Sequence, residues 1–275
     1  MSKYKLIASD LDGTLLNDGM EYTAANAAAI KEISDRGVIF VATSGRTFYE
    51  IPKSIRDDAN IRYVTYSNGT AVFDKKRNCD IISHRITKED ANKAFDILKD
   101  YDVLYTLHIN GYSNMDITNT KDSDFKHYQI NDYYKTLLLR SVMVDGIEKT
   151  GRETDGLEAV VIFFHSDEEM VKCSERLSGI PGITVTSSIG HNIELCSSSA
   201  GKGTALKELS DLLGISTEDV IAVGDNINDT SMFAVCGLSL CTQNGNKNAK
   251  LSADEVICSN NEHIAEFILK KYIGE

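Results

Sequence analysis

Residues 4–15 of the chain read YKLIASDLDGTL, and this stretch decides the fold. The apolar run Tyr4–Ser9 is typical of a short strand that is buried on both faces of a parallel sheet. Two carboxylates, Asp10 and Asp12, follow the run directly, and Gly13 continues as a turn. We therefore expect a central strand with acidic side chains at its carboxyl end.

Strands and helices alternate after this first strand. The expected elements are helix Ala24–Arg36, strand Val38–Ala42, a helix over Gly45–Arg56 that is interrupted or restarted at Pro52, strand Arg62–Ser67, and a hairpin of Thr70–Phe73 with Asp80–Arg85. A β-α-β-α-β order of this kind is the signature of a doubly wound α/β sheet. The alternation returns near the carboxyl terminus with helix Gly203–Leu213, strand Val220–Val223, helix Asp229–Cys236, strand Asp254–Cys258 and helix Glu262–Tyr272.

The middle of the chain has a different character, because strands follow one another with fewer helices between them. The expected elements are helix Thr87–Tyr101, strands Val103–Asn110 and Leu157–Phe164, helix Asp167–Leu177, and strands Ile183–Ser187 and Asn192–Cys196, while the polar segment Thr118–Arg140 fits neither pattern. We predict an α/β fold with a doubly wound, Rossmann-like parallel-sheet core. The core is expected to comprise residues 1–83 and 191–275, and an α+β domain is expected to be inserted at residues 84–190.

The composition is that of a globular protein with an acidic balance. Across 275 residues, 29 Lys and Arg stand against 41 Asp and Glu, which gives a net charge of −12. Nucleic acids and anionic membranes require basic surface, so we expect neither as a partner. Because no apolar run approaches the ~20 residues of a membrane span and no secretory cleavage pattern is present, we expect a cytoplasmic protein.

Cysteine and histidine give little functional signal. None of the six cysteines forms a C-x-x-C pair, so we interpret them as reduced core thiols. The six histidines share no helical or strand spacing with one another, and we expect ordinary surface or core histidines. The aromatic residues of the segment 125–134 have near-helical spacing, which favours a packed face over a platform for stacking bases.

Polar clusters follow three of the expected parallel strands. They are Asp10-Leu11-Asp12, Thr43-Ser44-Gly45-Arg46 and Gly224-Asp225-Asn226-Ile227-Asn228-Asp229. Ligands of open parallel sheets bind beyond the carboxyl ends of the strands, so four carboxylates are expected to meet there. Their repulsion calls for a bound cation, and oxygen ligands without nearby His or Cys favour Mg²⁺ over Zn²⁺.

These residue types suit phosphoryl transfer. A carboxylate can attack phosphorus to form an aspartyl-phosphate, and a second carboxylate two residues away can act as general acid and then as general base. Ser44, Lys202 and the backbone amides of the turn after Asp12 are candidate donors to the phosphoryl oxygens. A single Asp at a strand end is usually a turn or cap residue, but the clusters in this order favour catalysis.

The chain resembles the haloacid dehalogenase superfamily, and within it the Cof-like phosphatases with an α/β (type IIB) cap. Asp10-Leu11-Asp12-Gly13-Thr14 matches the D-x-D-G-T/V signature, and Ala42-Thr43-Ser44-Gly45-Arg46 is similar to the A-T-G-R segment. Lys202 matches the lysine that precedes a helix, and Gly224–Asp229 is similar to G-D-x-x-N-D. The four motifs in order cover the whole chain, with the cap inserted between the second and third.

The resemblance implies a role for each matching residue. Asp10 would be the nucleophile and a Mg²⁺ ligand, Asp12 would be the acid/base and bind the metal through its backbone carbonyl, and Asp225 would complete the protein's metal ligands. Ser44 and Lys202 would hold the phosphoryl oxygens.

Further residues would support this machinery. The resemblance implies that Asn228 contacts the phosphoryl group and that Asp229 supports the metal waters or the lysine. Gly45, Arg46 and Asn68 stand at the same sheet edge as supporting residues. Arg46 and Asn68 are equally consistent with substrate contact and with a purely structural turn.

We therefore expect a Mg²⁺-dependent phosphatase for small phosphorylated metabolites, with sugar phosphates favoured, acting through an aspartyl-phosphate. The inserted cap would close over the substrate and set specificity. Two alternatives stay open: a phosphotransferase or phosphomutase of the same fold, and a Mg²⁺/phosphate-binding regulatory module without turnover. Asp12 favours an enzyme, because a regulator needs no acid/base. A monomer or small homo-oligomer is expected.

Overall fold

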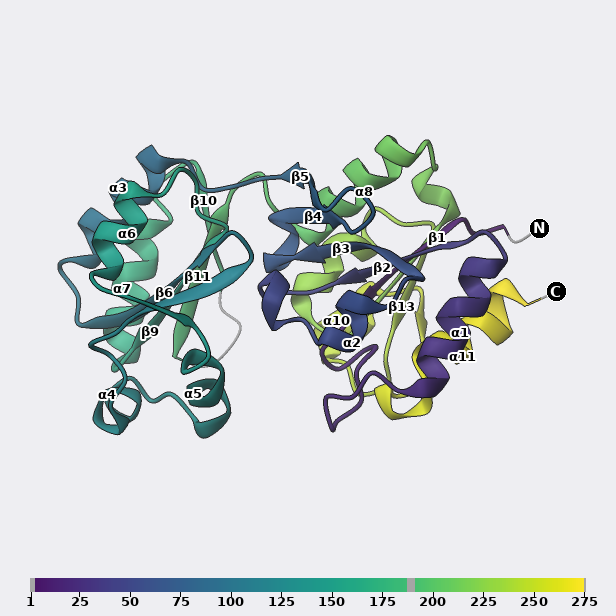
Figure 1. Ribbon diagram of the computed structural model, residues 1–275, viewed down its shortest axis with the longest axis horizontal. Helices are drawn as coiled ribbons and strands as arrows, with labels where there is room; N and C mark the ends of the chain where they lie inside the picture. The colour runs from purple at the N-terminus through teal and green to yellow at the C-terminus, as the bar shows by residue number, and fades with distance from the viewer. Residues whose placement is uncertain (1–2, 187–190, 275) are drawn as a thin grey trace. The chain divides into compact units, whose positions relative to one another are not determined.

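The computed structural model describes residues 3–186 and 191–274, and the chain divides into two compact units (Figure 1). The first unit combines the two ends of the chain, residues 1–83 and 201–275. The second unit comprises residues 84–200 and is inserted in the first. No described helix has both the length and the apolar character needed to cross a membrane.

An eight-stranded sheet forms the centre of the first unit, which we call the core. The strand order is β14-β13-β12-β1-β2-β3-β4-β5. The six parallel strands are β1 (Leu6–Asp10), β2 (Ile39–Thr43), β3 (Ile61–Tyr66), β12 (Val220–Gly224), β13 (Leu238–Cys241) and β14 (Glu255–Val256). The hairpin of β4 (Ala71–Asp74) and β5 (Cys79–Ser83) extends the β3 edge in antiparallel fashion. The predicted doubly wound α/β fold is confirmed.

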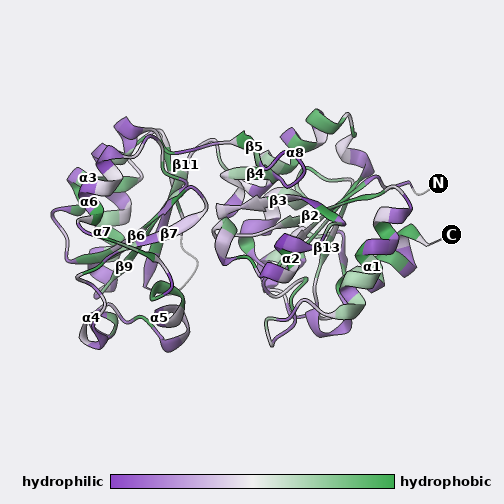
Figure 2. Ribbon diagram, viewed as in Figure 1, coloured by the Kyte–Doolittle hydropathy of each residue, from purple (hydrophilic) through white to green (hydrophobic). Residues whose placement is uncertain are grey.

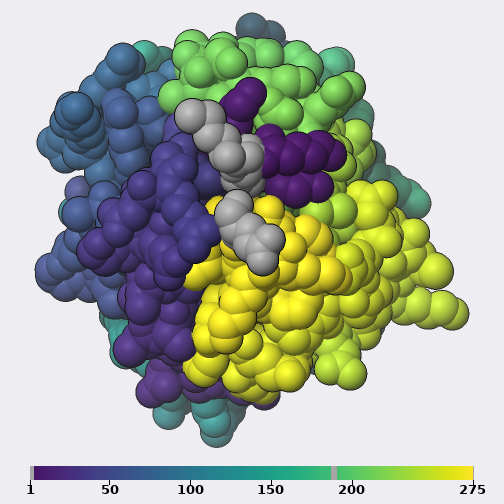
Figure 3. Space-filling model, turned by 90° about the vertical axis from the view of Figure 1, so that its right-hand side faces the viewer, coloured from purple at the N-terminus to yellow at the C-terminus, as the bar shows by residue number. Residues whose placement is uncertain are grey.

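Helices cover both faces of this sheet because its central strands are apolar on both sides. Along β1, Ile7 packs on one face with Ile30 of α1, whereas Leu6 packs on the other with Leu206 of α8. Figure 2 shows hydrophobic residues concentrated in the central strands. Figure 3 shows the face on which α1 and α11 lie side by side. The core helices are α1 (Ala24–Asp35), α2 (Lys53–Asp57), α8 (Lys202–Leu213), α9 (Thr230–Phe233), α10 (Lys247–Ser252) and α11 (Ile264–Ile268).

Some core elements differ from the sequence prediction. The helix expected over Gly45–Arg56 does restart after Pro52 as α2, but before it only a single 3-10 turn forms, at Phe48–Glu50. β13 and α10 were not predicted, because both are short and lack a clear periodic pattern. Cys79 lies exposed on the edge strand β5, so the expectation that all six cysteines are core residues is wrong for this one.

The inserted unit is an α+β domain with a six-stranded sheet in the order β10-β11-β9-β6-β7-β8. Its strands are β6 (Val103–Ile109), β7 (Tyr112–Asp116), β8 (Val142–Val144), β9 (Ala159–Phe164), β10 (Ile183–Thr186) and β11 (Asn192–Ser197). Its helices are α3 (Lys88–Leu98), α4 (Asp122–His127), α5 (Asp132–Leu138), α6 (Ile147–Glu153) and α7 (Asp167–Leu177). All neighbouring strands pair antiparallel except β7 and β8.

Two apolar clusters stabilise this unit, one on each face of its sheet. Phe95 of α3 and Leu177 of α7 pack with Leu107 of β6 in the larger cluster. Phe125 of α4 and Leu138 of α5 belong to a smaller cluster. The segment Thr118–Arg140, which fitted no pattern in the sequence, therefore contains two short helices, each contributing a buried apolar side chain.

The chain returns to the core later than the sequence indicates. We predicted the return at residue 191, but β11 pairs with β9 and β10 and so belongs to the inserted sheet. The second unit consequently extends to Ala200. The predicted strand Ile183–Ser187 is observed as β10 up to Thr186, and residue 187 lies outside the described residues.

Candidate active site

Three neighbouring central strands bring the predicted polar clusters to one edge of the core sheet. Asp10 is the last residue of β1, Ser44 follows β2 directly, and Asp225 follows β12 directly. β1 lies between β2 and β12, and both pairings are parallel. The carboxyl ends of the three strands therefore meet, as the sequence predicts.

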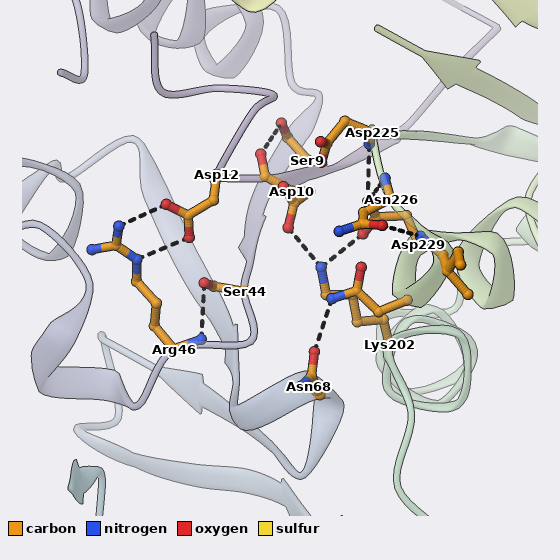
Figure 4. Close-up of polar contacts among 12 residues, drawn as sticks. Ser9, Asp10, Asp12, Ser44, Arg46, Asn68, Lys202, Asp225, Asn226 and Asp229 are labelled. Carbon is orange, nitrogen blue, oxygen red and sulfur yellow. Dashed lines mark hydrogen bonds and ion pairs between the residues drawn. The ribbon is translucent and has the colours of Figure 1, made fainter. Parts of the chain in front are cut away.

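Lys202 links two of the aspartates in a buried cluster (Figure 4). Its Nζ donates hydrogen bonds to Asp10 Oδ1 at 2.6 Å and to Asp229 Oδ1 at 2.7 Å. The Lys202 side chain is only 1% exposed, and those of its partners are 7% and 0% exposed. The lysine is the first residue of α8, so the start of that helix fixes its ammonium group against the end of β1.

Asp229 also fixes the loop that follows β12. Its Oδ2 accepts hydrogen bonds from the backbone N–H groups of Asp225, at 2.9 Å, and Asn226, at 3.0 Å. Both Asp229 oxygens are thus engaged, one by the lysine and one by the loop. Asp229 is therefore suited to hold Lys202 and the loop in place rather than to bind a ligand.

Burial and mutual repulsion perturb the acidic groups. Burial raises the pKa of Asp10 well above its ordinary value, the neighbouring aspartates add to this, and Lys202 opposes it. Burial, reinforced by Asp229, raises the pKa of Asp225 to about 7. Burial alone would lower the pKa of Lys202, but the attraction of Asp10 and Asp229 outweighs it and raises that pKa. These carboxylates therefore require a proton or a cation to share the site at neutral pH.

The residues present fit a divalent cation with oxygen ligands. Carboxylate oxygens of Asp10, Asp225 and Asp229 lie within 4.8 Å of one another. The site holds four aspartates, Asp10, Asp12, Asp225 and Asp229, and two cationic side chains, Lys202 and Arg46. When all four aspartates are ionised, two negative charges are left without a cation. A doubly charged ion that prefers oxygen, such as Mg²⁺, matches both the charge and the donor set.

Asp12 lies in a different environment from Asp10. Arg46 binds it through two parallel hydrogen bonds, from Nε to Oδ2 at 2.8 Å and from Nη2 to Oδ1 at 2.6 Å. The Asp12 side chain is 42% exposed. Arg46, for which the sequence left a substrate contact and a turn equally open, therefore holds the predicted acid/base.

Ser44 lies between Asp12 and Lys202 in Figure 4. Its Oγ accepts a hydrogen bond from the Arg46 backbone N–H at 3.1 Å. The adjacent hydroxyl, of Thr43, is buried and has no hydrogen-bond partner among the described residues. The two hydroxyls are thus distinguished by their surroundings, and Ser44 lies beside the other predicted residues.

The turn after β3 closes the site on the side of α8. Asn68 Oδ1 accepts a hydrogen bond from Asn228 Nδ2 at 3.0 Å. A Cβ on Gly45 would lie 3.0 Å from the same Asn68 oxygen. At Gly69, with φ of +89°, a Cβ would lie 2.3 Å from the Gly201 backbone. The absence of side chains at Gly45 and Gly69 therefore lets this turn pack closely against the start of α8.

The loop after β13 also contacts the site, and no feature of it was predicted from the sequence. Asn244 Nδ2 donates to the Gly13 carbonyl at 2.7 Å, and the backbone N–H of Asn246 donates to the Asp225 carbonyl at 2.8 Å. A Cβ on Gly13 would lie 2.6 Å from Asp225 Oδ2, so the turn after β1 and the loop after β12 are in close contact. The signal that could have identified the loop is the same as for the other clusters, a polar run after the apolar Leu238–Cys241.

A family model described as haloacid dehalogenase-like hydrolase matches residues 7–268. The chain belongs to this family. Its relatives include the 5-amino-6-(5-phospho-D-ribitylamino)uracil phosphatase YwtE of Bacillus subtilis, 29% identical over 290 residues that cover 98% of this chain and 99% of the relative. Another is the phosphatase YwpJ of Bacillus subtilis, 28% identical over 97% of this chain and 99% of the relative.

Solved structures of haloacid dehalogenase-like proteins share the fold over the full length. A haloacid dehalogenase-like hydrolase of B. subtilis is 25% identical with a TM-score of 0.82, and covers 97% of this chain and 99% of its own. The HAD subclass IIB sugar phosphatase BT4131 is 16% identical with a TM-score of 0.77 over 97% of this chain and 98% of its own, which establishes a common fold. The predicted haloacid dehalogenase family is confirmed, and this hydrolase is a phosphatase like the relatives that it matches over its whole length.

Proposed function

We propose that this hydrolase is a Mg²⁺-dependent phosphatase that removes phosphate from small metabolites through an aspartyl-phosphate on Asp10. The observation that carries the proposal is the buried cluster of Asp10, Lys202 and Asp229 at the carboxyl edge of the sheet. A nucleophile must be held still and must face a group that binds the phosphoryl oxygens. Asp10 and Lys202 meet both requirements.

In the first step, a carboxylate oxygen of Asp10 attacks phosphorus while the bond from phosphorus to the leaving oxygen breaks. Asp12 gives a proton to that oxygen, so the alcohol leaves neutral. Because both Asp12 oxygens accept hydrogen bonds from Arg46, Asp12 must change partners before it acts. The partial exposure of Asp12 makes such an exchange inexpensive.

In the second step, water attacks phosphorus and the bond between phosphorus and the Asp10 oxygen breaks. Asp12 now carries a negative charge and accepts the proton of the water. Inorganic phosphate leaves, and both aspartates return to their starting state.

The other predicted residues hold the phosphoryl group and its support. Lys202, Ser44 and Asn228 would donate to the phosphoryl oxygens. Asp229 would keep Lys202 charged and oriented, which its hydrogen bond to Nζ supports. Gly45, Arg46 and Asn68 would shape the surrounding turns.

Asp10, Asp225 and the backbone carbonyl of Asp12 would hold the Mg²⁺ ion. When bound, the ion would neutralise the carboxylates and stabilise the negative charge that develops on the phosphoryl oxygens. Lys202 would keep its hydrogen bonds to one oxygen of Asp10 and one oxygen of Asp229.

The substrates we propose are phosphorylated sugars and sugar alcohols. Two of the relatives, YwtE and YcsE of Bacillus subtilis, are named as phosphatases of a phospho-ribityl compound. The net charge of −12 disfavours nucleic acid and membrane surfaces as partners. We further propose that the enzyme acts in the cytoplasm as a monomer or small homo-oligomer.

A phosphate-release screen tests this function. Purified protein is incubated with sugar phosphates, sugar alcohol phosphates, nucleotides and cofactor phosphates, with Mg²⁺ or with a chelator. We expect phosphate release that requires Mg²⁺ and is lost in Asp10→Asn, whereas Asp35→Asn, on the exposed end of α1, keeps full activity.

The same screen separates the alternatives. A phosphotransferase or mutase would move the phosphoryl group to an added sugar without releasing phosphate. A regulatory module would bind Mg²⁺ and phosphate without turnover. Either result would contradict the proposed hydrolysis of phosphorylated metabolites.

A further inference from the structure

A second group of metal-binding side chains lies in the inserted unit and plays no part in the proposed phosphatase reaction. Asp102 directly precedes β6, His127 is the last residue of α4, and His165 directly follows β9. One potential ligand atom of each lies within 4.8 Å of the others. Separations of 25 and 38 residues along the chain explain why no sequence spacing indicated this group.

The two imidazole rings face the same carboxylate. His127 Nε2 lies 2.7 Å from Asp102 Oδ2, and His165 Nδ1 lies 3.9 Å from the same oxygen. The rings are stacked, with centroids 5.0 Å apart and planes inclined by 11°. Each of the three side chains therefore offers one potential ligand atom close to those of the other two.

A fourth oxygen lies at the edge of this group. Glu169, in the first turn of α7, has its Oε2 at 3.7 Å from His165 Nδ1. That oxygen is buried and has no hydrogen-bond partner among the described residues. The Glu169 side chain as a whole is 37% exposed, and it adds a negative charge beside His165.

Neighbouring side chains hold the proposed ligands in place. The Tyr128 hydroxyl donates to Asp102 Oδ1 at 2.7 Å, which leaves Oδ2 directed at the histidines. Gln129 Nε2 donates to the backbone carbonyl of His165 at 2.8 Å. Hydrogen bonds of this kind orient metal ligands and contribute to affinity.

We propose that Asp102, His127 and His165 bind one divalent transition-metal ion of the Zn²⁺ type, with the negative charge of Glu169 beside them. Nitrogen and oxygen donors together select such ions, in contrast to the all-oxygen aspartates of the active site. Tetrahedral Zn²⁺ with ligands at about 2.0–2.1 Å separates its ligand atoms by roughly 3.3 Å. The observed 2.7 and 3.9 Å bracket that value, so small rotations of exposed side chains would suffice.

The ion would connect the end of α4 with the start of β6 and the end of β9. α4 is only six residues long, and Phe125 is its buried residue. A metal bound by His127 would add a second attachment two residues away. Its role would thus be to stabilise the α4 segment of the inserted unit.

Zn²⁺ titration of the full chain tests the site. The protein is freed of metal with a chelator, returned to saturating Mg²⁺, and titrated with Zn²⁺ in competition with a chromophoric chelator. We expect one Zn²⁺ per chain, both in the unmodified protein and in Asp225→Asn, which disables the active-site aspartates. Co²⁺ at the same site should give visible absorption bands of a tetrahedral or five-coordinate ion.

His127→Gln and His165→Gln should each weaken Zn²⁺ binding by at least about 100-fold. His191→Gln is the matched control, since His191 is exposed and pairs with Asp167 at 2.7 Å without a second imidazole. Zn²⁺ should raise the Tm of the unmodified protein and of His191→Gln, but not of His127→Gln, whose far-UV circular dichroism verifies its fold. Failure of the unmodified protein to compete for Zn²⁺, or equal binding by His127→Gln, would overturn the proposal.

Discussion

Asp10 and Asp12 lie two residues apart at the end of one strand, yet their carboxylates occupy opposite environments. Asp10 is 5% exposed and shares Lys202 with Asp229, whereas the Asp12 side chain is 42% exposed and paired with Arg46. A buried charge depends strongly on its partner, while a partly exposed pair exchanges at little cost. The difference suits a fixed nucleophile beside an acid/base that must change partners and protonation during turnover.

The largest effect is expected from removing the nucleophile. Asp10→Asn should lower kcat/KM by at least about 10⁴-fold, because the residual rate after loss of a nucleophile comes from binding and electrostatic stabilisation alone. Steady-state phosphate release measures this against Asp35→Asn. Substantial turnover by a folded Asp10→Asn protein would remove Asp10 from its proposed role.

Asp12→Asn should reduce activity by about 10²- to 10⁴-fold on alkyl phosphates, since an amide cannot transfer the proton. The loss should be much smaller for 4-nitrophenyl phosphate, whose leaving group departs without a proton. Comparing kcat for the two substrates isolates the acid role. Equal losses on both would contradict it.

The ion pairs of Asp10 with Lys202 and of Asp12 with Arg46 should contribute differently to the free energy of unfolding. Lys202→Met leaves Asp10 and Asp229 buried without their cation and should lower the free energy of unfolding by about 3–5 kcal/mol. Arg46→Met should cost about 1 kcal/mol or less, because Asp12 is partly solvated. Urea denaturation of the metal-free variants measures both, and similar costs would show that the two pairs are energetically alike.

The turn at Gly69 packs against the residues that begin α8 and so positions Lys202. Comparing alanine substitutions at Gly69 and Gly37 tests this contact. Gly69→Ala should lower stability by more than Gly37→Ala, since both have positive φ but only Gly69 would bring its Cβ within 2.3 Å of the Gly201 backbone. Gly37→Ala should cost only the conformational strain, about 1–2 kcal/mol. Gly69→Ala should also reduce activity, whereas Gly37→Ala should not. Equal effects on stability, measured by urea denaturation, would contradict the close approach.

The last prediction concerns pH and Mg²⁺. In the metal-free protein, Asp225 has a pKa raised to about 7, so the folded state holds a proton that the unfolded state has lost above about pH 4. Stability of the metal-free protein should therefore fall as pH rises from about 4 to 7. Mg²⁺ binds the ionised carboxylate, so it should raise Tm more at about pH 8 than at about pH 5.5. Asp225→Asn should reduce this difference between the two pH values, because only Asp10 then titrates with a raised pKa in the site.

The sequence predicted the central strands and the polar residues at their ends, for a physical reason. Strands buried on both faces must be continuously apolar, so the change to Asp10, Ser44 or Asp225 marks where each strand ends. The parallel order of the strands then brings those ends together. The motifs left Asp229 to support either the metal waters or Lys202, and the structure shows its contact with Lys202.

Other features could not be predicted because they arise from tertiary packing. The pairing of Asp12 with Arg46 depends on two loops that no local pattern relates. The return to the core was placed too early, because only the pairing of β11 with β9 assigns that strand to the inserted sheet. His127 and His165 likewise meet through the inserted fold and not through spacing.

The stereochemical course at phosphorus tests the central claim most directly. A substrate whose phosphoryl group is made chiral with oxygen isotopes is turned over in isotopically labelled water, and the configuration of the released phosphate is determined. Transfer to Asp10 followed by transfer to water comprises two in-line displacements, so we predict net retention of configuration. Net inversion would mean that water attacks the substrate directly and would contradict an aspartyl-phosphate on Asp10.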